Sequence, residues 1–213
     1  MSLRSLSIPV LAGRLLLSAG FATLAAFAGA AQSPASLPPA PLPEPLAVGT
    51  ELVINNNGHM TTVTIQGQRP GATMRLVSFD QGKQRGTVVQ PNNPFVPPNE
   101  VALPGRPVER ATVVGNPDTI FPLTSGSKTT FQMRYDQRVE EWRCEVTGTE
   151  PIKAVVGADD SWVVVCVQSE NGATVQTVRR NYAPHLGIAV IGTYQRHDTG
   201  ATGRNQLMTM KRP

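Results

Sequence analysis

The chain has 213 residues, of which 40% are hydrophobic and 16% are charged, so it can bury one sizeable core or two small ones and is neither a disordered tail nor a coiled coil. Its 19 glycines and 19 prolines favour turns and strands over long helices. The 19 basic residues against 15 acidic ones give a net charge of +4, and loss of Arg4 and Arg14 with a leader would leave +2. This balance excludes a nucleic-acid-binding footprint, and three histidines with two cysteines exclude a multi-ligand metal centre.

Residues 15–31 form an uncharged stretch, LLLSAGFATLAAFAGAA, which follows Arg14 and ends in small-x-small triplets. This pattern predicts a signal peptide over residues 1–30, with Ala28-Gly29-Ala30 as the preferred cleavage triplet. An uncleaved anchor is the alternative, but a bilayer takes about 20 apolar residues and no positive cluster follows. No cysteine lies nearby to accept a lipid. We therefore expect a periplasmic or secreted protein with no stable membrane span after cleavage.

The residues after the leader change character several times. Residues 31–47 hold six prolines from Pro34 to Pro45 and predict an extended, solvated linker. Residues 48–90 predict a β meander, which opens with a hairpin at Asn56-Asn57-Gly58 and continues in strands at 72–80 and 85–90, with a turn at 81–83 between them. Residues 91–116 are again rich in proline, predict a long irregular crossing, and mark a subdomain boundary.

Residues 117–213 predict an antiparallel β region. After a turn at 125–127, alternation places Phe131, Met133 and Tyr135 on one face of a strand. Alternation also groups Trp142 with Cys144 and Val146, and Trp162 with Val164 and Cys166. The run WVVVCV is apolar throughout and predicts a central strand covered on both sides, after a turn at 157–160. Further strands are expected at 173–181, 186–195 and 206–211. The fold class is all-β, a twisted antiparallel sheet that is partly barrel-like.

Four segments of the chain resemble a group of uncharacterised exported bacterial proteins related to the DUF3108-type β domains. Residues 121–131 fit a PL-x-x-G-x-x-x-x-F pattern, and residues 142–150 fit W-x-C-x-V-x-G-x-E. Residues 157–166 and 182–187 fit a small-residue turn before V-x-C and a Y-x-P-x-x-G strand start, while Gly49-Thr50-Glu51 resembles the usual opening. The resemblance implies a twisted, partly barrel-like antiparallel fold in the periplasm, and it implies no chemistry.

Cys144 and Cys166 are candidates for a disulfide, because an oxidising compartment favours pairing of an even number of cysteines. Two buried free thiols are the alternative. A hairpin turning at 157–160 in perfect register would place Cys166 opposite Pro151 instead of Cys144. A bridge therefore requires a bulge, a bend at Pro151 or a contact across the core.

The usual catalytic constellations are missing from the sequence. His59, His185 and His197 have no zinc-ligand spacing, and a Cys–His pair built on His185 lacks a third residue that orients the imidazole. No G-x-S-x-G motif occurs, and Ser125 fits a hairpin turn. We predict no catalytic, cofactor-binding or metal-binding residues and no cofactor.

The conspicuous acids do not form a catalytic pair by themselves. Neighbouring residues of a strand point to opposite faces, which separates the carboxylates of Glu140-Glu141, while Asp159-Asp160 fits a turn and Asp80 stands alone.

Two further features bear on binding. Arg179-Arg180 suits an anionic glycan or phosphate, but a solvated strand end is the preferred interpretation. Four aromatic residues are candidates for the wall of a ligand pocket at the mouth of the sheet: Phe131, Tyr135, Trp142 and Trp162. The alternative is that these side chains fill the core.

These patterns favour a non-enzymatic β domain of the bacterial cell envelope that binds a partner protein, an envelope component or a small apolar ligand. The alternative is a periplasmic hydrolase whose acids converge only in the fold. No nucleic-acid partner is expected.

Overall fold

The computed structural model describes residues 37–79, 84–155 and 158–213. The predicted signal peptide, the first residues of the predicted linker and the predicted turn at 81–83 lie outside the described residues. The described residues belong to a single compact unit. Within the described part of the chain, no helix is long and apolar enough to cross a membrane.

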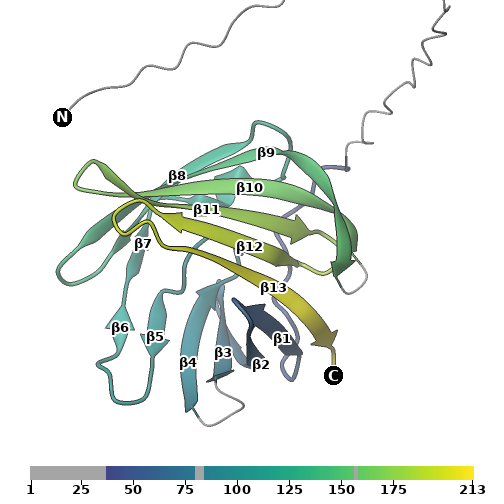
Figure 1. Ribbon diagram of the computed structural model, residues 1–213, viewed down its shortest axis with the longest axis horizontal. Helices are drawn as coiled ribbons and strands as arrows, with labels where there is room; N and C mark the ends of the chain where they lie inside the picture. Colours follow the sequence, from purple (N-terminus) through teal and green to yellow (C-terminus); the bar gives the residue numbers. More distant parts are fainter. Residues whose placement is uncertain (1–36, 80–83, 156–157) are drawn as a thin grey trace, which may run out of the picture. The chain divides into compact units, whose positions relative to one another are not determined.

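The chain forms one thirteen-stranded sheet in which all paired strands are antiparallel, and this confirms the all-β, partly barrel-like prediction (Figure 1). The strands are β1 (Glu51–Asn56), β2 (His59–Arg69), β3 (Ala72–Phe79), β4 (Gln84–Pro91), β5 (Glu100–Ala102), β6 (Glu109–Arg110), β7 (Thr112–Val114), β8 (Lys128–Arg134), β9 (Val139–Val155), β10 (Ala158–Glu170), β11 (Ala173–Ala183), β12 (Ile188–Arg196) and β13 (Thr202–Lys211). A short 3-10 helix, η2, spans Pro117–Ile120. Strands pair with their sequence neighbours, and β1 pairs with β13.

The two edges of this sheet meet at one bent segment of chain. The edge strands β6 and β7 are separated only by Ala111, and they pair on opposite sides, β6 with β5 and β7 with β8. The Ala111 N–H donates to the carbonyl of Asn99 at 2.8 Å. The sheet thereby forms a nearly closed barrel whose two edge strands are short. Closing a sheet in this way protects its edges from pairing with another chain.

The predicted crossing at 91–116 contains structure that the sequence pattern did not show. β5 and β6 lie within it and have only three and two residues, too few for a period-two signal. The irregular part is also buried, since Phe95 and Val96 are both fully inaccessible. The prediction of an irregular crossing is therefore wrong for these strands.

The hairpin between β1 and β2 is confirmed. Asn57 and Gly58 both have positive φ, 51° and 90°, as a type I′ turn requires. The Asn55 side-chain oxygen accepts a hydrogen bond from the Gly58 N–H at 2.7 Å.

The apolar run within β10, residues 162–167, is only partly covered on both faces. Trp162, Val164 and Cys166 are buried on the inner face, as alternation predicts. On the opposite face Val163 is buried, but Val165 and Val167 are half-buried. The prediction of a strand covered on both sides is wrong at those two valines.

Cys144 and Cys166 lie directly opposite each other on β9 and β10 and form a disulfide, with 4.0 Å between their Cα atoms. Two register shifts make this possible, one between Ala158 and Asp160 and one between Val163 and Val164. Of the three routes left open by the sequence, the structure shows the first, a bulge. The predicted turn at 157–160 is wrong, because β10 already begins at Ala158 and Asp160 pairs with Pro151.

The end of the proline-rich linker packs on the barrel. Ala40 is buried, donates its N–H to the carbonyl of Leu123 at 3.3 Å and accepts the Leu123 N–H at 2.7 Å. The carbonyl of Leu46 accepts a hydrogen bond from Gln68 on β2. The prediction of a solvated linker fits most residues of 37–47, which are exposed, but it is wrong at Ala40. Ala40 has both of the backbone groups that a bridge needs, whereas a proline lacks the N–H.

Two clusters of buried side chains fill most of the interior. The first joins the inner face of β8–β11 to Phe95, Val96 and the η2 region, and it includes Phe131, Trp142 and Trp162. The second joins β1–β3 to β12 and β13 through Leu52, Val190 and Leu207.

Candidate functional site

A cavity of about 240 Å³ lies on the inner face of the barrel. Its lining side chains alternate along the strands, for example Leu52 and Ile54 on β1 and Asn205 and Leu207 on β13. Leu52 and Leu207 also belong to the second buried cluster, which places the alternating set on the interior face. The cavity is therefore lined by strands from both halves of the chain.

Two arginine side chains line this cavity from separate walls. Arg75 belongs to β3 and Arg180 to β11, and β2, β1, β13 and β12 lie between those strands in the sheet. The inward positions follow from alternation, since Val77 on β3 and Val178 on β11 are buried two residues away. The interpretation of Arg179-Arg180 as a solvated strand end is wrong, because Arg180 lies in the middle of a strand and faces the interior.

Neither guanidinium has a carboxylate within 4 Å among the residues that the structure describes. The Nε of Arg75 is buried and has no hydrogen-bond partner there. Desolvation by burial lowers the pKa of Arg75 and that of Arg180 to about 10 each. Both groups therefore remain charged at neutral pH, and among the described residues neither half-buried side chain is paired with a carboxylate.

An irregular segment, residues 92–98, crosses the interior beside these arginines. Arg180 donates from Nη1 to the carbonyl of Pro94 at 2.8 Å, and Gln90 donates from Nε2 to the carbonyl of Val96 at 2.5 Å. Phe95 packs against Phe121 and Tyr182, with ring centroids 5.8 Å and 5.7 Å apart. The segment is thus held on both sides and forms one wall of the cavity.

Gly192 and Asn205 line the cavity beside Arg180. Gly192 lies opposite both Arg180 and Asn205 in the neighbouring strands, and a Cβ added to Gly192 would lie 2.5 Å from Asn205 Oδ1. The absence of a side chain at Gly192 therefore leaves room for the Asn205 side chain. Glu44, an exposed residue of the linker, also lines the cavity.

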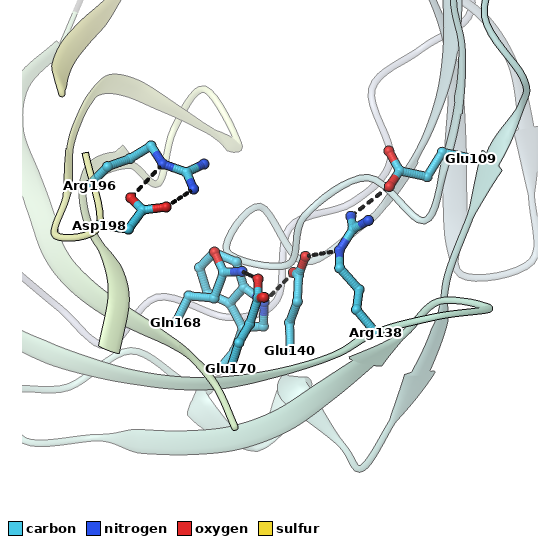
Figure 2. Close-up of polar contacts among 8 residues, drawn as sticks. Glu109, Arg138, Glu140, Gln168, Glu170, Arg196 and Asp198 are labelled. Carbon is cyan, nitrogen blue, oxygen red and sulfur yellow. Dashed lines mark hydrogen bonds and ion pairs between the residues drawn. The ribbon is translucent and has the colours of Figure 1, made fainter. Parts of the chain in front are cut away.

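A second hollow, of about 450 Å³, shares Arg180 with the first but is lined by polar groups that already have partners. Figure 2 shows Arg138 between Glu109 and Glu140. Arg138 donates to Glu140 at 3.0 Å and to Glu109 at 2.5 Å, and Trp142 Nε1 donates to Glu140 at 3.1 Å. Although burial lowers it, the pKa of Arg138 is raised overall by its hydrogen bonds to Glu140 and Glu109. These hydrogen bonds connect Glu109 of β6 with Glu140 of β9 through Arg138, so we assign this network a structural role.

Removing the Glu140 carboxylate is expected to destabilise the protein. Glu140 is 6% exposed and accepts from two donors, so Glu140→Ala leaves the buried Trp142 N–H without a partner and leaves Arg138 with Glu109 alone. We expect the free energy of unfolding to fall by about 1–3 kcal/mol in urea denaturation. Glu141→Ala is the matched control, since that side chain points to the other face and should change stability by less than about 0.5 kcal/mol. Equal losses in the two variants would contradict the assignment.

The four aromatic candidates occupy two kinds of place. Phe131, Trp142 and Trp162 are buried in the first cluster, and the Phe131 and Trp142 rings stack with centroids 6.3 Å apart. Tyr135 and Trp142 reach the second hollow, where the Arg138 guanidinium lies 3.7 Å from the centroid of the Tyr135 ring. A ligand-binding role of these four residues stays a prediction.

The remaining candidates are dispersed. His59 begins β2, His185 follows β11 in a turn, and His197 follows β12. Among the side chains that the structure describes, no group of three or more His, Cys, Asp or Glu residues is arranged to hold a metal ion.

One acid that sequence reasoning did not single out, Glu150, is tied to β11. It pairs with Arg179 and accepts from Asn181 Nδ2 at 2.5 Å. Although burial raises it, the pKa of Glu150 is lowered overall by these hydrogen bonds. This carboxylate therefore stays ionised and serves to join β9 to β11.

The comparisons with known proteins bear on the fold. No protein-family model and no curated protein matches the chain. The crystal structure of the hypothetical lipoprotein YmcC from Escherichia coli (K12) is similar, with a TM-score of 0.51 and 11% sequence identity over 77% of this chain and 85% of that chain. A Bacteroides fragilis protein with a YmcC-like fold aligns with a TM-score of 0.42 and 12% identity over 81% of this chain and 100% of that chain. The likeness to YmcC shows a shared fold for most of the two chains.

Proposed function

We propose that this protein is an exported, non-catalytic β-barrel domain of the bacterial cell envelope that binds a small ligand in the interior cavity beside Arg75 and Arg180. The observation that carries the proposal is that cavity, whose wall combines apolar side chains such as Leu52 and Ile188 with many polar ones, among them both arginines. Nearly closed sheets commonly bind ligands in their interior, and a wall this polar suits a polar ligand. A volume of about 240 Å³ suits a ligand smaller than those of typical pockets, which measure about 300–1,000 Å³.

Three observations support export. The leader pattern over residues 1–30 is that of a cleaved signal peptide. The Cys144–Cys166 disulfide suits an oxidising compartment. The Escherichia coli protein of similar fold is described as a lipoprotein. The four motifs shared with DUF3108-type domains point the same way, and we include kinship with those exported proteins in the proposal.

Export is tested by N-terminal sequencing of the protein from a bacterial host. The mature chain should start between Gly29 and Gln32, because the small-residue triplets end there. Recovery of the intact chain from Met1 in the membrane fraction would contradict export by cleavage.

The state of the acids supports a binding role over hydrolysis. Glu140 is engaged by Arg138 and Trp142, and Glu150 by Arg179 and Asn181. A glycosidase-type mechanism needs one carboxyl group with a raised pKa facing a second one across the substrate. Both carboxylates are instead engaged by donors of the protein itself.

Ligand binding is tested by calorimetric titration of the mature protein with five small probes: inorganic phosphate, succinate, its neutral analogue succinamide, hexanoate and hexanol. We expect at least one probe to bind the wild-type protein and to lose binding in Asn205→Trp, which places an indole on the cavity wall beside Gly192. Thr209→Trp, on an exposed position of the same strand, is the matched control and should retain binding. Absence of binding by all five probes, or equal binding by both variants, would contradict the proposal.

A further inference from the structure

We infer that the ligand carries an anionic carboxylate or phosphate group, and that Arg75 and Arg180 bind this group inside the barrel. The inference rests on the proposed function, because it names the chemistry of the ligand for the same cavity. It goes further by assigning the two residues that select the ligand.

The first argument is the missing hydrogen-bond partner of Arg75. Its Nε is buried and, among the residues that the structure describes, has no acceptor. Buried polar side-chain atoms in folded proteins nearly always have a partner, so an orphaned donor on a cavity wall calls for one. An oxygen of a bound anion would supply the missing acceptor.

The second argument is the missing counter-charge. In the described structure, no carboxylate lies within 4 Å of Arg75 or Arg180, while six ion pairs occur elsewhere. The acid on the cavity wall, Glu44, is exposed on the linker and is not paired with either arginine. Both arginine side chains are half-buried on the wall of one cavity, and charges removed from water are ordinarily paired, so we take the missing partner to come from outside the chain.

The third argument is the donor geometry of arginine. Arg180 uses Nη1 on the carbonyl of Pro94, and a guanidinium has five N–H donors. Arginine favours carboxylate and phosphate groups because their oxygens accept two parallel N–H bonds. Burial lowers the pKa of both side chains to about 10, which leaves them charged under physiological conditions and raises the gain from a nearby anion.

The apolar part of the cavity wall restricts the chemistry of the rest of the ligand. Leu52, Ile54, Ile188 and Leu207 line the same cavity. A ligand with an anionic end and a short apolar or neutral remainder would contact both kinds of wall. Bare inorganic phosphate would contact only the arginines, so it should bind more weakly than a phosphate or carboxylate with an organic remainder.

The test compares charged and neutral probes of matched shape by calorimetry. Hexanoate should bind at least about tenfold more tightly than hexanol, and succinate at least about tenfold more tightly than succinamide, because only the acids provide an anionic oxygen. If phosphate binds and neither succinate nor hexanoate does, the site is assigned to phosphate. If the two acids bind and phosphate does not, it is assigned to carboxylate. Equal affinities within each pair would overturn the inference.

Variants separate the role of the arginines from that of the cavity. Arg75→Met and Arg180→Met should each weaken hexanoate binding at least about tenfold, while hexanol binding stays within about twofold of wild type. Arg75→Lys keeps the charge without the fork of donors and should lose less than Arg75→Met. Glu44→Gln removes a negative charge from the cavity wall and should strengthen anion binding.

The possible failures are distinguishable. If hexanol and hexanoate bind equally, and both are lost in Asn205→Trp, the barrel binds ligands but the anionic class is wrong. If anions bind equally well to Arg75→Met, Arg180→Met and wild type, they bind elsewhere and the inference is wrong. If no probe binds, both the proposed function and the inference fail.

Discussion

Removal of the Cys144–Cys166 disulfide is expected to lower the free energy of unfolding by about 3 kcal/mol, because it frees a loop with a sequence separation of 22 residues in the unfolded chain. The two cysteines join the central strands β9 and β10, whose inner faces hold Trp142 and Trp162. For a domain of this size the loss corresponds to a drop of roughly 6–12 °C in Tm. Thermal unfolding of the Cys144→Ala/Cys166→Ala variant measures it.

Reduction of the wild-type protein is the control for this prediction, because it breaks the bond without deleting sulfur atoms from the core. Reductant should bring the wild-type Tm down towards that of the double variant and leave the double variant unchanged. An unchanged wild-type Tm, with mass measurement showing both thiols free, would contradict a stabilising disulfide.

Replacement of Arg75 by methionine is expected to make the protein more stable. The variant removes a charge that is desolvated and lacks a counter-ion in the described structure, and methionine can pack against the apolar wall of the cavity. We expect the free energy of unfolding to rise by about 1–3 kcal/mol in urea. A residue that lowers stability in this way is typical of a binding site.

The pH dependence of this gain follows from the sign of the pKa shift. The folded-state pKa of Arg75 is lowered to about 10, which means that folding disfavours the charged form. The free-energy cost of burying this charge is therefore fully present below that pH. The difference between Arg75→Met and wild type should therefore stay constant between about pH 6 and pH 8 and shrink only as the pH rises through 10. Arg106→Met, at an exposed turn, should change stability by less than about 0.5 kcal/mol. A destabilised Arg75→Met variant would contradict the assignment of an unpaired interior charge.

Much of the fold could be predicted from local sequence signals. Asn57-Gly58 predicts its hairpin because few residues adopt positive φ, and alternation predicts the buried faces of Trp142 and Trp162 because side chains of a strand alternate. The closure at Ala111 could not be predicted, because β6 and β7 are too short to show a period and their pairing depends on partners far along the chain.

For a related reason, the sequence pattern does not single out Arg75, and it favours a solvated strand end over an anion site for Arg180. Arg180 follows Arg179 in a strand, and a charged residue at an alternating position is usually a solvent-facing one. The signal that could have identified it is parity: Val178 and Tyr182, two residues before and after Arg180, are both buried. In the same way Arg75 shares its parity with the buried Thr73 and Val77. Parity places a side chain on a face, but only the closed sheet shows that this face encloses a cavity.

The most direct measurement of the central claim is a crystal structure of the mature protein grown with bromide, whose anomalous scattering locates bound anions. An anion site formed by Arg75 and Arg180 predicts a bromide peak inside the barrel, within contact distance of both guanidinium groups, and its loss in Arg75→Met crystals. Bromide peaks confined to the outer surface, with the interior cavity empty of anions, would contradict the claim.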